Sequence, residues 1–314
     1  MADATGFLAV RQPRLAGRTA APGPKSVSLR NQPLDPKQPS RTALGAAAYR
    51  AAHQVLDAGD IFEDPMAMAI LGPQAAVMVE RISAGPGSKR LRNFMAARSR
   101  YAEDCLAAAV ARGVRQVVVL GAGFDTFALR NPHAPLGLQV FEVDHPATQI
   151  WKRQRLNQLG LAPPRPIAFV AVDFETGNLA EGLAASAFDT ARPAFFLWLG
   201  VVPYLHQAAI TATLAFISSL PKAEVVFDYS EPVESFTAEH RAEVAELEAR
   251  AASLGEPWLS HFQPAVIRDK LAALGFRELE DLGVSEIARR YPSASTQADA
   301  SGPGPHVIHA RRAD

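Results

Sequence analysis

The stretch from Gln116 to Arg130, QVVVLGAGFDTFALR, limits what this chain can fold into more than any other. Its apolar, β-branched run over Val117–Leu120 predicts a buried strand, and the glycines Gly121 and Gly123 follow directly. Glycine allows a sharp turn and a close approach of a ligand to the backbone. We expect a helix within a few residues. A strand, a glycine turn and a helix are typical of an open α/β sheet, whose ligand crevice lies at the carboxyl ends of its strands.

The glycine turn departs from the dinucleotide pattern G-x-G-x-x-G. Thr126 stands where the third glycine would be, and Asp125 puts a negative charge beside the turn, which is a poor place for a phosphate. About 20 residues further on, a second predicted strand over Leu138–Val143 ends at Asp144, and an acid there suits a pair of ribose hydroxyls. These features favour S-adenosylmethionine over a nicotinamide dinucleotide. The alternative interpretation is a tight turn followed by a solvated acid.

Composition excludes several classes of protein. Lys plus Arg and Asp plus Glu number 32 each among 314 residues, so the formal net charge is zero, which argues against nucleic acid as the main partner. The single cysteine, Cys105, excludes an internal disulfide framework and a cysteine-based zinc site. No signal-peptide pattern and no apolar run long enough for a bilayer are present. We therefore expect no membrane association and a cytoplasmic location.

The chain divides into a tail and one large domain. Residues 1–40 are rich in proline and predict a flexible tail or an extended arm. Residues 41–115 predict a helical cap, and residues 116–314 a sheet core with a charged helical insertion near 234–254. Further strands are predicted at Phe169–Val172, Ala194–Val202, Glu224–Phe227, Phe276–Leu282 and His306–Ala310, and further helices at Thr42–Leu56, Asp64–Ile82 with an interruption at Gly72-Pro73, a stretch ending at Arg112, Pro146–Leu159, Gln207–Leu220 and Pro264–Leu274.

Five strands that alternate with helices, followed by two terminal strands, predict a doubly wound, mostly parallel seven-stranded sheet. Polar or glycine residues stand at the carboxyl ends of four of these strands: Gly121 and Gly123, Asp144, Asp173 and Tyr204. Because such ends meet at one edge of the sheet, their convergence is a stronger signal for a binding crevice than any one of them.

Several motifs now add a family resemblance. The chain resembles the leucine carboxyl methyltransferase family, class I S-adenosylmethionine-dependent enzymes, over roughly residues 42–312. The motifs that carry the resemblance are FEDPMA (Phe62–Ala67), ARSRYAEDCL (Ala97–Leu106), VVVLGAGFDTFALR (Val117–Arg130), FEVDHP (Phe141–Pro146), VDFE (Val172–Glu175), LGVVPYL (Leu199–Leu205) and GEPW (Gly255–Trp258). The resemblance implies a Rossmann-like α/β fold with an N-terminal helical lid.

The resemblance also implies roles at the matched positions. Arg98 would pair with the methionine carboxylate of the cofactor, as a guanidinium forks onto a carboxylate. Gly121 and Gly123 would allow a close backbone approach, and Asp144 would take the ribose hydroxyls. Arg50 would help to hold the carboxylate.

On the adenine side, Asp173 and Phe174 would flank the base; otherwise Asp173 is a helix cap. One departure stands out, since many members have a glutamate where this chain has Leu199. This change predicts an acceptor different from the protein-phosphatase C-terminus of the family, and a more apolar one.

Methyl transfer to an ionised carboxylate needs no general base, whereas a phenol or alcohol needs one. The candidates at strand ends are Tyr204, His206 and Asp228, of which Tyr204 is the best placed by motif; each is otherwise a wall residue. His306 and His309 lie three apart on a strand and so point to opposite faces. No cluster has ligand spacing, and we predict no metal.

The sequence thus predicts an S-adenosyl-L-methionine-dependent O-methyltransferase that acts on a carboxylate, or a hydroxyl, of a small molecule or peptide. The helices before Gln116 and the insertion near 234–254 would form a lid that sets substrate choice. Two alternatives stay open: an NAD(P)-dependent oxidoreductase on a Rossmann fold, and a non-catalytic cofactor-binding protein. The sequence leaves the acceptor and the oligomeric state undetermined.

Overall fold

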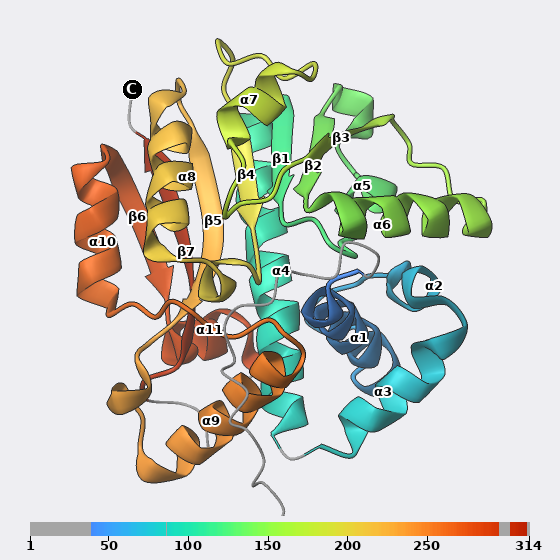
Figure 1. Ribbon diagram of the computed structural model, residues 1–314, viewed down its shortest axis with the longest axis vertical. Helices are drawn as coiled ribbons and strands as arrows, with labels where there is room; N and C mark the ends of the chain where they lie inside the picture. The colour runs from blue at the N-terminus through green and yellow to red at the C-terminus, as the bar shows by residue number, and fades with distance from the viewer. Residues whose placement is uncertain (1–38, 86, 295–301, 313–314) are drawn as a thin grey trace, which may run out of the picture. The chain divides into compact units, whose positions relative to one another are not determined.

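The structure is a computed structural model that describes residues 39–85, 87–294 and 302–312. Its strands are β1 (Gln116–Leu120), β2 (Gln139–Asp144), β3 (Ile167–Ala171), β4 (Phe195–Trp198), β5 (Glu224–Ser230), β6 (Phe276–Leu282) and β7 (Pro305–Arg312). They form one sheet in the order β3-β2-β1-β4-β5-β7-β6 (Figure 1). β7 runs antiparallel to both of its neighbours, β5 and β6. The predicted doubly wound, mostly parallel seven-stranded sheet is confirmed.

Among the described residues, four α-helices precede the first strand in the chain, and the other helices lie between or after the strands. They are α1 (Arg41–Leu56), α2 (Ala67–Leu71), α3 (Ala75–Ser83), α4 (Ser88–Ala111), α5 (Phe127–Arg130), α6 (Pro146–Leu159), α7 (Leu179–Ala184), α8 (Gln207–Ser219), α9 (Ala238–Ser253), α10 (Pro264–Ala273) and α11 (Val284–Arg290). Ser40 caps α1, as expected, because its hydroxyl accepts a 3.0 Å hydrogen bond from the Ala43 N–H. The interruption predicted at Gly72-Pro73 is a 3-10 turn between α2 and α3.

The two faces of the sheet carry separate cores. Alternation along β1 sends Val118 and Leu120 to one core, which α7, α8 and α10 cover, and Val117 and Val119 to the other, which α4 and α11 cover. All five residues of β1 are buried, as expected for the centre of a parallel sheet. A third core joins α1, α2, α3 and α6 through small and branched side chains. This third core holds the N-terminal helices against the helix that follows β2.

One strand is shorter than the sequence predicts, and the helix after the glycine turn is short. The fourth strand, predicted over Ala194–Val202, ends at Trp198 and gives way to a 3-10 turn over Val202–Tyr204 that contains Pro203, which has no N–H for a ladder. The helix after the glycine turn, α5, has only four residues. Pro132 explains its end, because a proline disfavours the helical conformation of the residue before it.

Sequence periodicity missed two short helices, α7 and α11, of six and seven residues. Each spans about two turns, too few for a helical period to stand out. The insertion near 234–254 contains the sixteen-residue α9. The predicted tail over residues 1–40 lies outside the described residues except for its last two, and the predicted division of the chain stays a prediction.

Candidate functional site

The glycine turn after β1 lies against two other parts of the chain. Gly121 and Gly123 have φ angles of +62° and +42°. A Cβ on Gly121 would lie 2.3 Å from Cγ2 of Val201, and one on Gly123 would lie 2.9 Å from Cβ of Ala43. The close approach that requires glycine is therefore made by the turn after β4 and by the first turn of α1. Both segments therefore lie at the carboxyl end of β1, where the binding crevice is predicted.

Asp144 ends β2 beside this turn. One carboxylate oxygen accepts from the Gly123 N–H, and the other accepts from the His145 N–H at 2.6 Å. Burial raises the pKa of Asp144 above its ordinary value, while these two N–H groups act to lower it. Each oxygen keeps a further lone pair. The carboxylate is thus fixed in place and still able to accept from a diol.

Asp173 and Phe174 lie in the turn after β3. The Asp173 carboxylate accepts from the Glu175 N–H at 3.0 Å and from the Thr176 hydroxyl at 2.9 Å. Without a ligand, Asp173 therefore fixes a local turn. This role resembles the helix cap that was the alternative interpretation. Phe174 is half-buried and packs against the core under α7 and α8.

Arg98 reaches the end of β4 from the middle of α4. It is 5% exposed, its Nη1 donates to Asp228, and its Nη2 would lie 2.9 Å from a Cβ on Gly200. Asp228 also accepts from the Gly200 N–H at 2.5 Å. The Arg98 Nε is buried and has no hydrogen-bond partner within the part of the chain that the structure describes. An unpaired cationic donor at the crevice fits the predicted carboxylate contact.

Two of the three candidate bases are poorly suited to take a proton, and the third lies on the surface. Burial raises the pKa of Tyr204, with Trp258 and Thr42 acting in the opposite direction. Asp228 is held by Arg98 and by a backbone N–H. His206 lies on the surface, where its Nδ1 is 2.8 Å from a carboxylate oxygen of Glu175.

A buried cluster around Asp64, which sequence reasoning missed, ties the cap to the glycine turn. Asp64 is fully buried and accepts from the Thr126 hydroxyl at 2.7 Å and from the Arg50 Nε at 3.2 Å. Arg50 Nη2 donates to the Phe124 carbonyl at 2.6 Å, and Arg130 Nε lies 3.4 Å from Asp64. Arg50 therefore braces the turn in this structure. The Asp64-Pro65 dipeptide pointed only to a helix start.

A buried ion pair joins β2 to the helix that follows it. Glu142 of β2 is 1% exposed, and Lys152 of α6 is 2% exposed, with 2.7 Å between the carboxylate and the ammonium. Burial raises the pKa of Glu142 to about 7, and Lys152 opposes the rise. The pair lies on the strand that carries Asp144 at its end, so it helps to fix that strand against α6.

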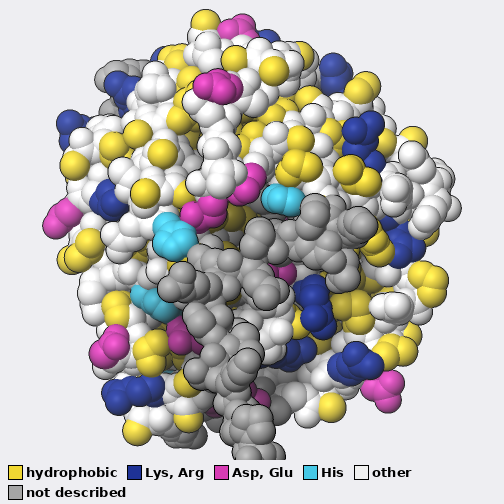
Figure 2. All heavy atoms as spheres, in the orientation of Figure 1, with side chains coloured by type: hydrophobic (Ala, Val, Ile, Leu, Met, Phe, Trp, Pro, Cys, Tyr) yellow, Lys and Arg dark blue, Asp and Glu magenta, His cyan; other side chains and the backbone are white. Residues whose placement is uncertain are grey.

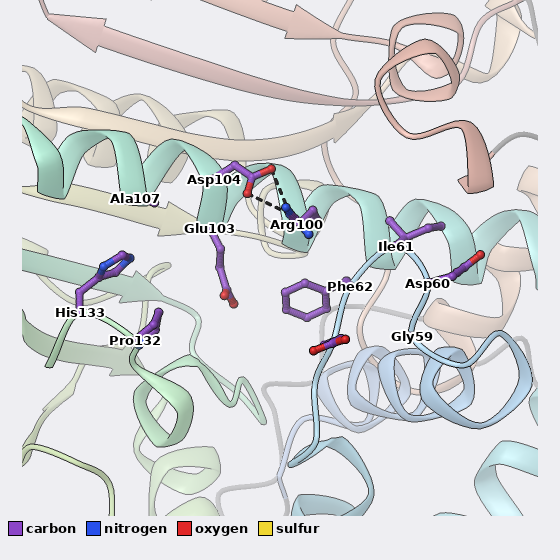
Figure 3. A pocket seen from close by; sticks show the side chains of 11 residues that line it. Gly59, Asp60, Ile61, Phe62, Arg100, Glu103, Asp104, Ala107, Pro132 and His133 are labelled. Carbon is purple, nitrogen blue, oxygen red and sulfur yellow. Dashed lines mark hydrogen bonds and ion pairs between the residues drawn. The ribbon is translucent and has the colours of Figure 1, made fainter.

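A surface hollow of about 340 Å³ lies away from the strand-end crevice (Figure 3). It lies between the loop after α1, the middle of α4 and the loop after α5. Two of its acidic side chains are engaged: Asp104 accepts from Arg100 at 2.9 Å, and Glu103 accepts from Arg130 at 2.6 Å. None of the predicted cofactor residues lines it.

The charges on the visible face are mixed. Figure 2 shows Asp, Glu and His side chains close together near the middle of the face that Figure 1 views, with Lys and Arg spread around them. Within the described ranges, no three His, Cys, Asp or Glu side chains gather as metal ligands. No helix in those ranges has the length and apolar character needed to cross a bilayer.

Comparison with known proteins decides the family. Residues 43–218 match the leucine carboxyl methyltransferase family. The chain is 32% identical over 298 residues to a Bacillus subtilis protein provisionally named S-adenosyl-L-methionine-dependent methyltransferase YktD, covering 86% of this chain and 97% of that one. This chain belongs to the leucine carboxyl methyltransferase family. The family resemblance and the cofactor predicted from the glycine turn and Asp144 are confirmed at this level.

Other relatives agree. A Mycolicibacterium paratuberculosis protein with the same provisional description is 32% identical over 188 residues, which cover 57% of this chain and 61% of that one. A crystal structure of a Streptomyces avermitilis protein of the DUF574 family has a TM-score of 0.55 at 17% identity and covers 85% of this chain and 97% of that one. The structural likeness shows a shared fold.

Proposed function

We propose that this methyltransferase-family protein is an S-adenosyl-L-methionine-dependent O-methyltransferase, and that its acceptor is a carboxylate of a small molecule or peptide. One observation carries the proposal. The glycine turn, the fixed Asp144 carboxylate and the unpaired Nε of Arg98 stand at the ends of neighbouring strands, while neither Tyr204 nor Asp228 is suited to take a proton and His206 lies on the surface. This arrangement supports cofactor binding together with an acceptor that needs no deprotonation.

The cofactor would be held by groups that the structure leaves able to bind. Asp144 has a lone pair free on each oxygen for the ribose hydroxyls. Arg98 has a buried donor for the methionine carboxylate, and an unmet buried donor is unfavourable until a ligand pairs with it. Asp173 and Phe174 would border the adenine. Asp173 would accept a hydrogen bond from the base in addition to, or in place of, those it accepts from Glu175 and Thr176.

S-adenosyl-L-methionine supplies an activated methyl group when bound. The chain's own contribution is to hold the acceptor oxygen in line and to exclude water. A hydroxyl acceptor would need a proton taken away, yet the raised pKa of Tyr204 keeps its phenol protonated, and the ion pair with Arg98 stabilises the Asp228 carboxylate. An ionised carboxylate avoids this need, so these side chains favour ester formation over ether formation.

Leu199 supports an apolar acceptor. It stands directly after β4, is half-buried, and packs against the core that α4 and α11 cover. It gives the crevice an aliphatic wall at the end of β4, where many family members carry a glutamate. The mixed charge of the molecular face shown in Figure 2 also fits a small molecule or peptide better than a nucleic acid.

The first test is calorimetric titration of the full chain with S-adenosyl-L-methionine and S-adenosyl-homocysteine. We expect micromolar binding of both, and a loss of roughly tenfold to a hundredfold in Asp144→Asn, the range for a hydrogen bond to a charged group. Asp269→Asn, at an exposed position of α10, is the matched control. Failure of the folded wild type to bind either ligand would overturn the proposal.

The acceptor class is tested with a radiolabelled methyl donor and a panel of acids, phenols and alcohols. We expect labelled product that releases methanol in mild alkali, as a methyl ester does. A product stable to alkali would identify a hydroxyl acceptor and contradict the carboxylate assignment.

A further inference from the structure

One carboxylate from the C-terminal half of the chain completes the start of the first cap helix. Glu256 follows α9, and its Oε1 accepts from the Arg41 N–H at 2.8 Å and the Thr42 N–H at 3.4 Å. Its Oε2 accepts from the Ser40 hydroxyl at 2.8 Å and from the Thr42 hydroxyl. All four of these donors belong to the first turn of α1 or to its cap, 214–216 positions away in sequence.

The chemistry of a helix start explains why an acid stands there. The first N–H groups of a helix have no partner within it, and the helix dipole makes that end positive. The first turn of α1 has no acidic residue of its own, and Ser40 satisfies only the Ala43 N–H. Glu256 therefore supplies both the missing acceptors and the negative charge.

The segment that carries Glu256 is anchored to the turn after β4 rather than to the cap. The Leu259 N–H donates to the Pro203 carbonyl at 2.6 Å, and the Ser260 hydroxyl donates to the Leu205 carbonyl at 2.6 Å. Between them and Glu256, the ring of Trp258 meets that of Tyr204 edge-on, with 6.5 Å between the ring centres. The segment is thus fixed to the turn after β4, and Glu256 is its polar contact with α1.

The first turn of α1, in its turn, borders the glycine turn. Cβ of Ala43 lies 2.9 Å from the position that a Cβ on Gly123 would occupy. The Ser40 N–H donates to the Thr148 hydroxyl of α6 at 3.1 Å. A ligand bound against the glycine turn and Asp144 would therefore lie beside the start of α1.

We infer that Glu256 is a positioning residue that latches the first turn of α1 over the cofactor crevice and so sets how long the cofactor stays bound. The inference rests on the proposed function for the place of the cofactor. Breaking the latch separates the Glu256 segment from α1 and leaves both the sheet and the anchoring of the segment intact. Glu256 touches no reacting atom and acts through α1.

The test compares Glu256→Gln with Glu246→Gln, an exposed glutamate of α9 for which the described chain offers no partner. Glutamine keeps the size of the side chain but loses the charge, and it replaces one of the two acceptor oxygens by an amide donor. In the ligand-free full chain, we expect amide hydrogen exchange at Arg41 and Thr42, followed by NMR, to rise about tenfold, the effect of losing one charge-assisted hydrogen bond. Exchange in β1 should stay at the wild-type rate.

Stopped-flow dissociation of S-adenosyl-homocysteine supplies the second readout. We expect it to accelerate about tenfold in Glu256→Gln, with kcat for the first accepted substrate changed less than KM for the cofactor. Ser40→Ala, which loosens the same turn from the other side, should give a smaller acceleration. Glu246→Gln should match the wild type in both measurements.

Two results would overturn the latch. Unchanged exchange at Arg41 and Thr42, or a rise shared by β1, would reduce Glu256 to a general stabilising residue. Faster exchange at the helix start with a wild-type dissociation rate would show that α1 does not gate the cofactor. Failure of the proposed function is seen separately, as absence of binding by the wild type.

Discussion

On the side of the crevice formed by β1, β2 and β3, the strand-end carboxylates are held by partners close in the chain, whereas on the side of β4 and β5 the polar and aromatic groups have partners from far along it. We call these the cofactor side and the acceptor side. On the cofactor side, Asp144 accepts from the N–H groups of Gly123 and His145, and Asp173 accepts from the Glu175 N–H. The longest of these separations is 21 positions.

On the acceptor side, Asp228 pairs with Arg98, 130 positions earlier, and Tyr204 meets Trp258 of the segment after α9. The buried ion pairs follow the same division, because Glu142 of β2 pairs with a lysine on the helix that directly follows that strand. Local geometry therefore fixes the carboxylates of the cofactor side, although the cap braces its glycine turn through Arg50 and Asp64, whereas the acceptor side depends throughout on contacts between distant parts of the chain.

The largest expected effect comes from removing a long-range ion pair of the acceptor side, that of Arg98 with Asp228. Asp228→Ala removes the carboxylate that faces the buried Arg98 guanidinium and should lower the free energy of unfolding by about 3–5 kcal/mol, the range for an uncompensated buried charge. Urea unfolding of the variant measures the loss. Asp173→Ala, which removes a half-buried local acid of the cofactor side, should cost about 1 kcal/mol, the usual net value of a hydrogen bond. Equal losses in the two variants would contradict the comparison.

The Glu142–Lys152 ion pair lies on the cofactor side, and breaking it should lower the free energy of unfolding in a way that depends on pH. Lys152→Met should lower the free energy of unfolding by about 3–5 kcal/mol at pH 8. At that pH the buried Glu142 must either stay ionised without its partner or take up a proton, and both cost free energy. The pKa of Glu142 is already raised by burial to about 7 in the wild type, and loss of Lys152 raises it further. A raised carboxyl pKa means that the folded state binds more protons than the unfolded state, so stability increases as the pH falls toward the unfolded pKa.

The loss in Lys152→Met should therefore be smaller at pH 5 than at pH 8 in urea unfolding. Glu142→Gln combined with Lys152→Met should recover most of the stability at pH 8, because no buried charge is left at this pair. A loss independent of pH would show that packing, rather than charge, makes Lys152 important.

The glycine turn gives a smaller effect with a matched control. Gly121→Ala places a methyl group 2.3 Å from Val201 at a left-handed φ, and it should cost about 2–4 kcal/mol by strain and overpacking together. Gly137→Ala has a similar φ of +83° with open space around it, and it should cost about 1 kcal/mol. Thermal unfolding of both variants separates the close approach from the backbone strain. Equal losses would mean that backbone strain alone makes Gly121 necessary.

The smallest effect concerns a contact that crosses the crevice on the surface. His206→Gln removes an exposed pair with Glu175, which joins the turn after β3 to the turn after β4. Exposed ion pairs contribute little, so urea unfolding should show a change of less than about 1 kcal/mol. A larger loss would mean that bridging the two sides matters even where water reaches the contact.

Much of the fold could be predicted because its signals are local. The predicted bounds of the helix over Pro146–Leu159 and of the strand over Phe276–Leu282 agree with the structure. The strand β1 and its glycine turn could be recognised from a run of β-branched residues and two glycines. Where the prediction was wrong, as in the length of β4, a turn with a proline ended an apolar run that otherwise continues as a strand would.

The sequence by itself determined the order of the strands and of the longer helices, the family and the cofactor, because periodicity and motifs act over a few neighbouring positions. Only the tertiary structure decided that Arg98 pairs with Asp228 and that Glu256 completes the start of α1. Contacts between side chains so far apart depend on how the chain closes on itself. No local pattern records which buried donor will meet which acceptor.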